Sequence, residues 1–211
     1  MFTGIVAAKG RILSCTPLRD GRGRRLRVQA GSLALDDVAL GDSIAIQGAC
    51  MTVVELEPGH FGVDVSEESL AHTVGLDAPG EVNLEKAMRL ADRVGGHLVT
   101  GHVDGVGRVR AFERIDESHL LRIEVPASLA HYVARKGSVT IDGVSLTINA
   151  VVDEASGCVI DINLIPHTVA VTTLQRLTAG DLVNLEIDLI ARYLERLRLG
   201  APADTGAGER G

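Results

Sequence analysis

Apolar and polar residues alternate along short segments of this chain, and Gly, Asp or Pro breaks each segment. Successive side chains of a strand point to opposite faces, so such alternation predicts half-buried strands. The clearest segments are residues 43–46, 51–56, 61–65, 121–125, 139–141 and 159–162. Turn residues separate them at intervals typical of an all-β sandwich or barrel. The pattern therefore predicts an all-β protein.

Helical spacing of apolar residues is rarer. Residues 128–136 follow a proline and predict a short helix, and residues 189–200 predict a helix after the last strand. In the second of these, three apolar residues recur at helical spacing: Tyr193, Leu194 and Leu197. The tail, 201–211, consists mainly of Gly, Ala and polar residues, a composition typical of disorder.

Segments of the first half of the chain recur in the second half. The matching pairs are 3–6 with 100–103, 48–53 with 143–148, 69–73 with 168–172, and 82–85 with 183–186. The copies lie 95 to 101 residues apart, which is too long for a solenoid repeat and fits the duplication of a whole domain. We expect a first domain over 1–96 and a second over 97–188. Each is predicted to be a six-stranded Greek-key β-barrel, because closure leaves no exposed strand edge. Each copy is expected to begin with a strand that carries the Thr-Gly-x-Val pattern of residues 3–6 and 100–103.

Composition and charge exclude several classes of protein. The formal net charge is −7 and aromatic residues make up 2% of the chain. Both values disfavour a nucleic-acid partner, which needs a basic surface and often aromatic faces for stacking. Cys15, Cys50 and Cys158 form no CxxC pair, so a disulfide framework or a zinc ribbon is not expected. With no GxGxxG after a predicted strand either, we expect no metal, flavin or nicotinamide cofactor.

The sequence also gives expectations about location. No apolar run approaches the ~20 residues that cross a bilayer, and the first residues lack a basic region followed by an apolar one. We therefore expect a cytoplasmic protein without a membrane partner.

Two strand segments carry paired small polar residues. Residues two apart share a strand face, so Cys50 and Thr52 point one way, and Ser145 and Thr147 do so in the second copy. Such pairs suit a rim that hydrogen-bonds a flat polar ring. The ordinary preference of threonine for strands is the alternative explanation, and the sequence leaves both open.

Five blocks, in order along residues 1–199, resemble one known family. They read MFTGIV (1–6), GGHLVTGHVD (95–104), KGSVTIDGVSLT (136–147), LIPHT (164–168) and GDLVNLE (180–186). Together they resemble the α-chain riboflavin synthase family of lumazine-binding domain proteins. The chain departs from the family pattern at Gln47, Met51, Ser69 and Thr100, where each residue keeps the size or the hydrogen-bonding type.

The resemblance implies the last reaction of riboflavin biosynthesis. Two molecules of 6,7-dimethyl-8-ribityllumazine react, and one donates a four-carbon unit to the other. The products are riboflavin and 5-amino-6-(D-ribitylamino)uracil. Family members are homotrimers in which the first domain of one subunit faces the second domain of a neighbour, and the C-terminal helix, here 189–200, holds the trimer together. Association with lumazine synthase is left open.

The resemblance also implies catalytic residues: His102, Ser145, Thr147, Cys50 and Phe2. His102 is the first choice for acid–base catalysis, because an unperturbed histidine titrates near neutral pH. Ser145 and Thr147 either bind the ring or polarise a water or hydroxide nucleophile at its C7. Cys50 has no evident base beside it, and Phe2 either stacks on the substrate or plugs the barrel mouth.

Substrate binding is expected from matching stretches of both halves. In the first half these are Gly4, Ile5, Val6, Cys50, Met51, Thr52, Asp64, Val65, Ser66, Glu67, Glu68 and Ser69. In the second half they are Gly101, His102, Val103, Lys136, Ser145, Leu146, Thr147, Asn163, Leu164, Ile165, Pro166, His167 and Thr168. The backbones of 4–6 and 101–103 are expected at the pyrimidine edge, since glycine lets the main chain approach a ligand closely. His97, after two glycines, is assigned to a turn or strand start.

Two rival functions remain. The same fold also serves as a non-catalytic lumazine-binding antenna protein, and a plain structural all-β protein is a weaker possibility. An antenna needs one usable pocket, whereas both Thr-Gly segments and both Thr-bearing strands are intact here. That retention favours the enzyme.

Overall fold

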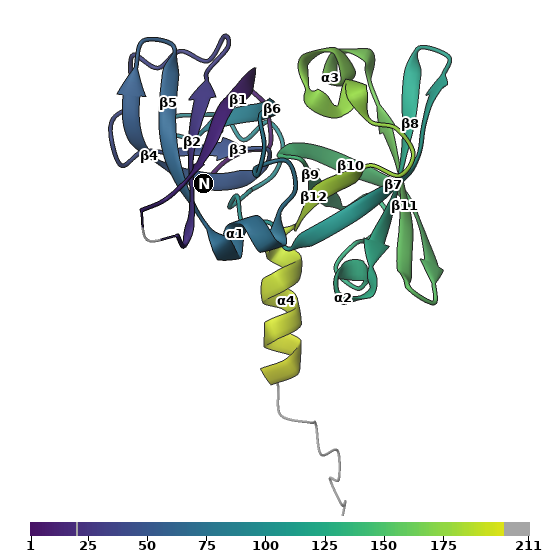
Figure 1. The fold of residues 1–211 in the computed structure, drawn as a ribbon. Helices are drawn as coiled ribbons and strands as arrows, with labels where there is room; N and C mark the ends of the chain where they lie inside the picture. The colour runs from purple at the N-terminus through teal and green to yellow at the C-terminus, as the bar shows by residue number, and fades with distance from the viewer. Residues whose placement is uncertain (20, 201–211) are drawn as a thin grey trace, which may run out of the picture.

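Two β-barrels and a projecting helix make up the protein (Figure 1). The computed structural model describes residues 1–19 and 21–200. The first barrel consists of β1 (Ala8–Pro17), β2 (Gly23–Gln29), β3 (Ser43–Ile46), β4 (Ala49–Glu57), β5 (His60–Ser66) and β6 (Gly80–Lys86). The second consists of β7 (Gly105–Ile115), β8 (Ser118–Pro126), β9 (Ser138–Ile141), β10 (Val144–Glu154), β11 (Gly157–Leu164) and β12 (Leu182–Ile187). The expected disordered tail, 201–211, lies outside the described residues.

Both barrels close with the same strand order. The first runs β1-β2-β5-β4-β3-β6, and the second, read from β7, runs β7-β8-β11-β10-β9-β12. All neighbouring strands are antiparallel. The register shifts after Val53 in β4 and after Ile148 in β10, which are matching positions. Such bulges bend a strand, as closure of a small barrel requires. The predicted duplicated all-β fold is confirmed.

Four short helices connect strands, and a longer one, α4, follows the last strand. They are α1 (Glu67–His72), α2 (Ala127–Ala130), α3 (Pro166–Val171), the 3₁₀ helix η1 (Thr173–Arg176) and α4 (Leu189–Gly200). The helix predicted over 128–136 is wrong in extent, because α2 ends at Ala130. Lys136 has a left-handed backbone (φ 68°), and its N–H donates to Ile148 O at 2.7 Å. A residue with a left-handed backbone cannot belong to an α-helix, so no helix can extend to Lys136.

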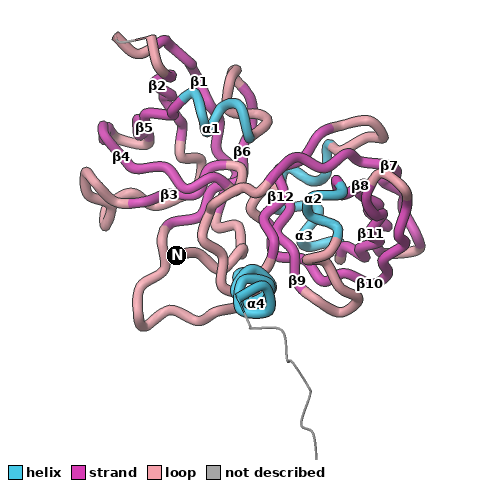
Figure 2. Tube along the Cα trace, turned by 90° about the horizontal axis from the view of Figure 1, so that it is seen from below, coloured by secondary structure: helices cyan, strands magenta, loops and turns pink. Residues whose placement is uncertain are grey.

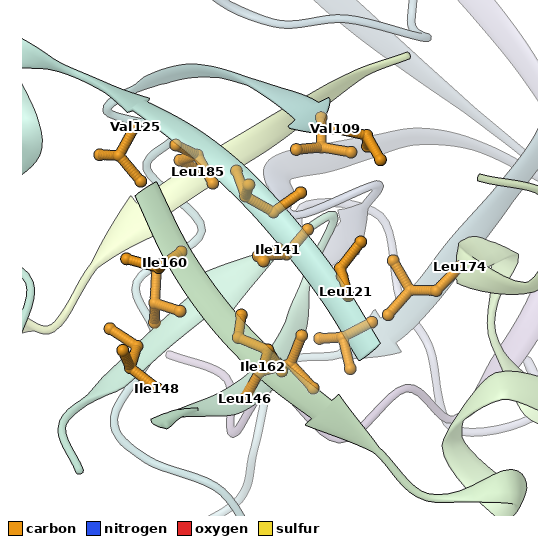
Figure 3. Close-up of a cluster of buried hydrophobic side chains, with 14 of the residues drawn as sticks. Val109, Leu121, Val125, Ile141, Leu146, Ile148, Ile160, Ile162, Leu174 and Leu185 are labelled. Carbon is orange, nitrogen blue, oxygen red and sulfur yellow. The ribbon is translucent and has the colours of Figure 1, made fainter. Parts of the chain in front are cut away.

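Each barrel is filled by its own apolar core. Alternate residues of the strands point inward, so β4 and β10 both show the burial pattern that the sequence alternation predicts. Figure 3 shows part of the second core, where Leu121 of β8, Ile141 of β9, and Ile160 and Ile162 of β11 converge. Burial of such side chains stabilises a fold by about 25 cal/mol per Å² of apolar surface. Each half therefore has a core of its own.

The β3–β4 and β9–β10 turns meet head to head between the barrels. Gln47 and Asp142 both adopt left-handed backbones, with φ of 50° and 49°. The next residues, Gly48 and Gly143, are in such close contact that a Cβ on Gly48 would lie 2.7 Å from the Gly143 nitrogen. Only glycines allow the two turns to touch in this way.

Two buried asparagines lock this contact reciprocally. Asn83 on β6 donates its amide to Asp142 O at 2.9 Å, and Asn184 on β12 donates its amide to Gln47 O at 2.9 Å. The backbone N–H of Asn83 donates to the Gln47 side chain, and that of Asn184 to the Asp142 carboxyl. Asn184 also exchanges two hydrogen bonds with the backbone of Val74. Each barrel thus satisfies polar groups of the other.

Helix α4 stands clear of both barrels. Figure 2 shows it end-on from below, next to the space between the two barrels. One side is fixed to the second barrel: Arg192 pairs with Asp104, and Glu195 accepts hydrogen bonds from Tyr132 and His131. The opposite side carries large apolar residues that are 61–70% exposed: Ile190, Tyr193, Leu194 and Leu197. No helix among the described residues is long and apolar enough to span a membrane.

Loss of the Asn184 side chain should uncouple the barrels. We expect Asn184→Ala to destabilise the protein by about 2–4 kcal/mol, because it leaves the backbone groups of buried Gln47 and half-buried Val74 without these partners. Asn149→Ala, at an exposed position, is the matched control and should change stability by less than about 0.5 kcal/mol. Urea unfolding of both variants measures the difference. Equal stabilities would contradict the lock.

The Asp142 carboxyl should make the lock sensitive to pH. Complete burial raises its pKa from 3.8 to about 7, and this effect outweighs the hydrogen bond from the Asn184 N–H. Between about pH 4 and pH 7 the native state therefore binds a proton that the unfolded state has lost, so stability falls as pH rises through this range. Asp142→Asn removes the titration. We expect the stability of this variant relative to the parent to increase from pH 5 to pH 8 by unfolding midpoints, and a constant difference would refute the assignment.

Candidate functional site

The segments that precede the two barrels are exchanged between them. The Ser145 N–H on β10 donates to Gly4 O, and the Cys50 N–H on β4 donates to Gly101 O, both at 2.8 Å. Val6 packs against the core of the second barrel, and Val103 packs against the core of the first. Each Thr-Gly-x-Val segment therefore lies on the other half's barrel.

This arrangement corrects one expectation. Residues 3–6 and 100–103 were expected to begin strands of their own copies, but β1 begins at Ala8 and β7 at Gly105. Directly before the two segments, an isolated antiparallel bridge joins Phe2 to Val99. Neither segment belongs to a barrel strand.

The first-barrel face combines β4, β5 and the second exchanged segment. Cys50 is half-buried and Thr52 exposed, both pointing outward. Val53 pairs with Val63, a register that places Thr52 beside Asp64. The residues of this face are Cys50, Thr52, Asp64, Ser66 and Ser69, with Gly101, His102 and Val103 next to Cys50.

Several polar residues of the first-barrel face have partners within the chain. Arg25 on β2 binds Asp64 at 2.5 Å and holds the pKa of that carboxyl below its usual range. Ser66 caps α1 by accepting the N–H of Ser69 at 3.1 Å. The exposed Glu68 lies 3.1 Å from His72 on the same helix. These contacts fix the outer edge of the face.

The second-barrel face is the counterpart. Ser145 is half-buried and Thr147 exposed on β10, and the pairing of Ile148 with Ile162 places Thr147 beside Asn163. The other expected residues follow in the Ile165–Pro166–His167–Thr168 stretch, where Ile165 precedes α3 and Pro166 is its first residue. Gly4, Ile5 and Val6 lie next to Ser145, and Lys136 lies in the turn before β9.

Some predicted residues do not present their side chains to either face. Met51, Val65, Leu146 and Leu164 are buried in the barrel cores, so only their backbones can reach a ligand. Phe2 is 0% exposed and packs with Val99 and Ala45. Its ring is therefore buried within this chain, between residues of the two halves.

His97 contacts Ser145, which the sequence did not predict. Its Nδ1 lies 2.7 Å from Ser145 Oγ, and its Nε2 lies 3.3 Å from Thr140 Oγ1. Burial lowers the pKa of His97, so the neutral ring is favoured and can accept the Ser145 proton. The one hint in the sequence was the glycine before His97. Gly96 allows the close approach, because a Cβ there would lie 2.7 Å from Ser145 Oγ. The assignment of His97 to a turn or strand start missed this pairing.

His102 lies on the other face and in a different environment. It is exposed, has no hydrogen bond among the described residues, and follows the Gly101 carbonyl that contacts Cys50. The halves therefore differ chemically. Ser145 has a histidine in hydrogen-bond contact, whereas Cys50 has a solvent-exposed histidine nearby in the chain.

An open cavity of about 740 Å³ adjoins the second-barrel face. It is lined by Glu85 and the connection after β6, by Thr3, Ile5 and Ala7, and by Asp37, Val38, Asp42 and Ser43. Of the predicted binding residues only Ile5 borders it. Among residues 1–19 and 21–200 no group of three or more His, Cys, Asp or Glu side chains could hold a metal ion.

Comparison with known proteins relates both halves to one family. The lumazine binding domain model matches residues 3–87 and 100–188. The riboflavin synthase of Photobacterium leiognathi is 45% identical over 93% of this chain and 88% of its own length. That of Mycobacterium tuberculosis (strain ATCC 25618 / H37Rv) is 43% identical over 95% and 100%, and that of Bacillus subtilis (strain 168) is 38% identical over 93% and 89%.

Solved structures show the same architecture. LumP complexed with 6,7-dimethyl-8-(1'-D-ribityl) lumazine has a TM-score of 0.75 at 25% identity, covering 88% of this chain and 98% of LumP. LumP complexed with riboflavin has a TM-score of 0.75 at 26% identity, covering 89% and 99%. The identity to the synthases is much higher than to LumP. The chain belongs to the riboflavin synthase family of lumazine-binding domain proteins.

Proposed function

We propose that this chain is a riboflavin synthase that binds two molecules of 6,7-dimethyl-8-ribityllumazine and transfers a four-carbon unit between them. The products are riboflavin and 5-amino-6-(D-ribitylamino)uracil. The observation that carries the proposal is the duplicated outward face, centred on Cys50 and Thr52 in one half and on Ser145 and Thr147 in the other. Two identical substrates need two similar binding faces, and 38–45% identity to riboflavin synthases supports the reaction.

The protein's part in this reaction is positioning and proton transfer. The substrate is itself electrophilic and its C7 methyl is acidic, so holding two rings in contact can supply about 7–11 kcal/mol of the barrier. Acid–base groups add about 10²–10⁴-fold. The exchanged segments present backbone groups beside each face, where they can bind the polar edge of a pyrimidine ring.

Ser145 and His97 are the proposed proton-transfer pair. The neutral imidazole at 2.7 Å can take the hydroxyl proton while Ser145 or a water attacks, or while C7 methyl protons move. Thr140 holds the far ring nitrogen, which orients the histidine. On the other face His102 is free to turn toward a bound ring. Cys50 lacks a hydrogen-bonded base and serves as a contact surface.

The two faces are proposed to meet between subunits. Thr52 and Thr147 are exposed in the single chain, so a substrate on either face stays open to water until another surface covers it. The first-barrel face of one chain would cover the second-barrel face of another. A homotrimer held by α4 is proposed, because the helix projects from the barrels with an apolar stripe at the spacing of a helix-bundle seam.

A lumazine-carrying antenna protein is the second candidate. LumP shares the fold and has been solved with both a lumazine and riboflavin. Turnover decides between the two. We expect the purified full chain, incubated with ribityllumazine alone and a chelator, to form riboflavin and the pyrimidine product in equal amounts. Binding without product formation would identify an antenna.

The proton-transfer pair should be detectable in single variants. We expect His97→Ala and Ser145→Ala each to lower kcat/KM by about 10²-fold, and the double variant to lose little more, because the two residues act as one unit. His60→Gln is the control, because the His60 ring is hydrogen-bonded to the Pro58 carbonyl and is not part of the pair. Parent-like turnover of His97→Ala would exclude the histidine from the chemistry, and additive losses would separate it from Ser145.

Removal of α4 should dissociate the assembly. We expect a chain ending at residue 189 to be monomeric by light scattering while its barrels keep their thermal unfolding transition, because no barrel strand is lost. Leu194→Asp should act in the same direction, whereas Arg196→Asp at an exposed polar position serves as the charge control. An unchanged assembly after truncation would show that α4 does not hold it.

A further inference from the structure

Two buried glutamates hold the exchanged segments in place. On β12, Glu186 Oε1 accepts the N–H and the hydroxyl of Thr100, each at 2.7 Å, and its Oε2 accepts the N–H of Gly101 at 3.0 Å. On β6, Glu85 does the same for Thr3 and Gly4, with distances of 2.7, 2.7 and 3.0 Å. Each carboxylate therefore satisfies three donors of a segment that has no neighbouring strand.

The carboxylate completes a clamp around each glycine. The Gly101 N–H is held by Glu186, and its carbonyl is held by the Cys50 N–H. Gly101 has a left-handed backbone (φ 77°), and a Cβ there would lie 2.7 Å from Cys50 Cβ. Both peptide groups of the residue are thus fixed against the first-barrel face. The direction of the next residue, His102, follows from that geometry.

The matching clamp serves the second-barrel face. Glu85 holds the Gly4 N–H, and the Ser145 N–H holds the Gly4 carbonyl. A Cβ on Gly4 would lie 2.6 Å from Ser145 Cβ. The next residue is Ile5, and Thr3 O also accepts the His97 N–H at 3.2 Å. Glu85 therefore acts on the segment that carries both the Ile5 backbone and a contact to His97.

Neither glutamate forms a salt bridge among the described residues, and the cationic groups that act on them, the N-terminal ammonium on Glu85 and Arg192 on Glu186, do so without direct contact. Both are less than 10% exposed, and burial raises the pKa of each despite the donated hydrogen bonds. Burying a carboxylate without a directly paired cation has a free-energy penalty. A neutral side chain could therefore hold the segment as well if the role were purely structural. A carboxylate is, however, an acceptor at both oxygens and can take three donors at once, whereas a glutamine amide presents donors at one end.

We propose that Glu186 and Glu85 are positioning residues for the reaction, Glu186 acting through Gly101 on His102 and the Cys50 face, and Glu85 acting through Gly4 on the Ser145 face. The inference rests on the proposed function in that these faces bind the substrates. Neither glutamate needs to touch a substrate itself. Their task is to hold two backbone segments at a fixed distance from the strands that complete each face.

Glutamine variants of the full chain test the proposal. Gln keeps the length of the side chain but turns an amide N–H₂ toward one donor, so Glu186→Gln should expose the Gly101 N–H and Glu85→Gln the Gly4 N–H. We expect amide hydrogen exchange by NMR to accelerate at least about tenfold at that glycine only, and kcat to fall about tenfold. Glu57→Gln, which removes a surface pair with Arg27, is the control and should change neither.

A double-mutant cycle identifies the route of action. If Glu186 acts through His102, Glu186→Gln should slow turnover much less in a His102→Gln background, while Glu85→Gln should slow it as much as in the parent. Thr100→Val and Thr100→Ser provide a milder pair should Glu186→Gln fail to fold. The valine removes one hydrogen bond of three and should slow turnover, and the serine should restore it.

The outcomes separate this proposal from the proposed function. Unchanged exchange at Gly101 and Gly4 in the two glutamine variants overturns the positioning role, whatever the activity. If the parent chain makes no riboflavin, the proposed function is refuted. Hydrogen exchange at Gly101 and Gly4 then still shows whether the glutamates hold the two segments. Accelerated exchange with parent-like kcat in both variants also overturns the proposal, because the segments would then be held without consequence for the chemistry.

Discussion

Burial of backbone that belongs to no strand is the constraint on which the rest of the structure depends. The segments before β1 and β7 lie between the two barrels, where Gly4 and Gly101 are buried and their N–H and C=O groups must find partners. Carboxylates from β6 and β12 satisfy the N–H groups, and strand N–H groups of the opposite barrel satisfy the carbonyls. These partners come from both halves at once. The halves cannot separate without exposing unpaired groups, so the duplicated domains behave as one body.

The same constraint places chemistry on the two faces. Each exchanged segment is held at its glycine, so the residue after it, Ile5 or His102, is carried to a strand edge of the other barrel. The scaffold is nearly symmetric, yet the polar groups on it are not. Thr140, which contacts His97, corresponds to Ala45 in the first half, and a methyl group cannot accept a hydrogen bond. A symmetric frame with unlike faces suits two identical substrates that must play different parts.

Residues that act within one strand or one repeat were predictable, and contacts between distant segments were not. Alternation along β4 and β10 gave the outward direction of Thr52 and Thr147, because strand geometry depends only on neighbours in the sequence. The exchange of the two segments between the barrels was not predicted. The Thr-Gly-x-Val pattern is typical of a strand start, and the sequence does not show that its partners lie in the opposite barrel. The contact of His97 with Ser145 spans 48 residues and depends on Gly96 having no side chain. The predicted end of the helix at Lys136 failed for the same kind of reason, since that residue is hydrogen-bonded to Ile148 on β10.

The asymmetric attachment of α4 bears on how the proposed assembly can close. A contact between the first-barrel face of one chain and the second-barrel face of the next is heterologous, and such contacts propagate indefinitely unless the rotation between subunits closes a ring. Helix α4 is fixed to the second barrel alone, through Arg192 and Glu195, and these residues turn its apolar stripe away from that barrel. If the apolar stripes of the α4 helices pack together on one axis, each chain is related to the next by a rotation about that axis. Only rotations that close a ring of subunits are then allowed. In the proposed trimer the helix therefore limits the number of subunits, while the barrels supply the faces that react.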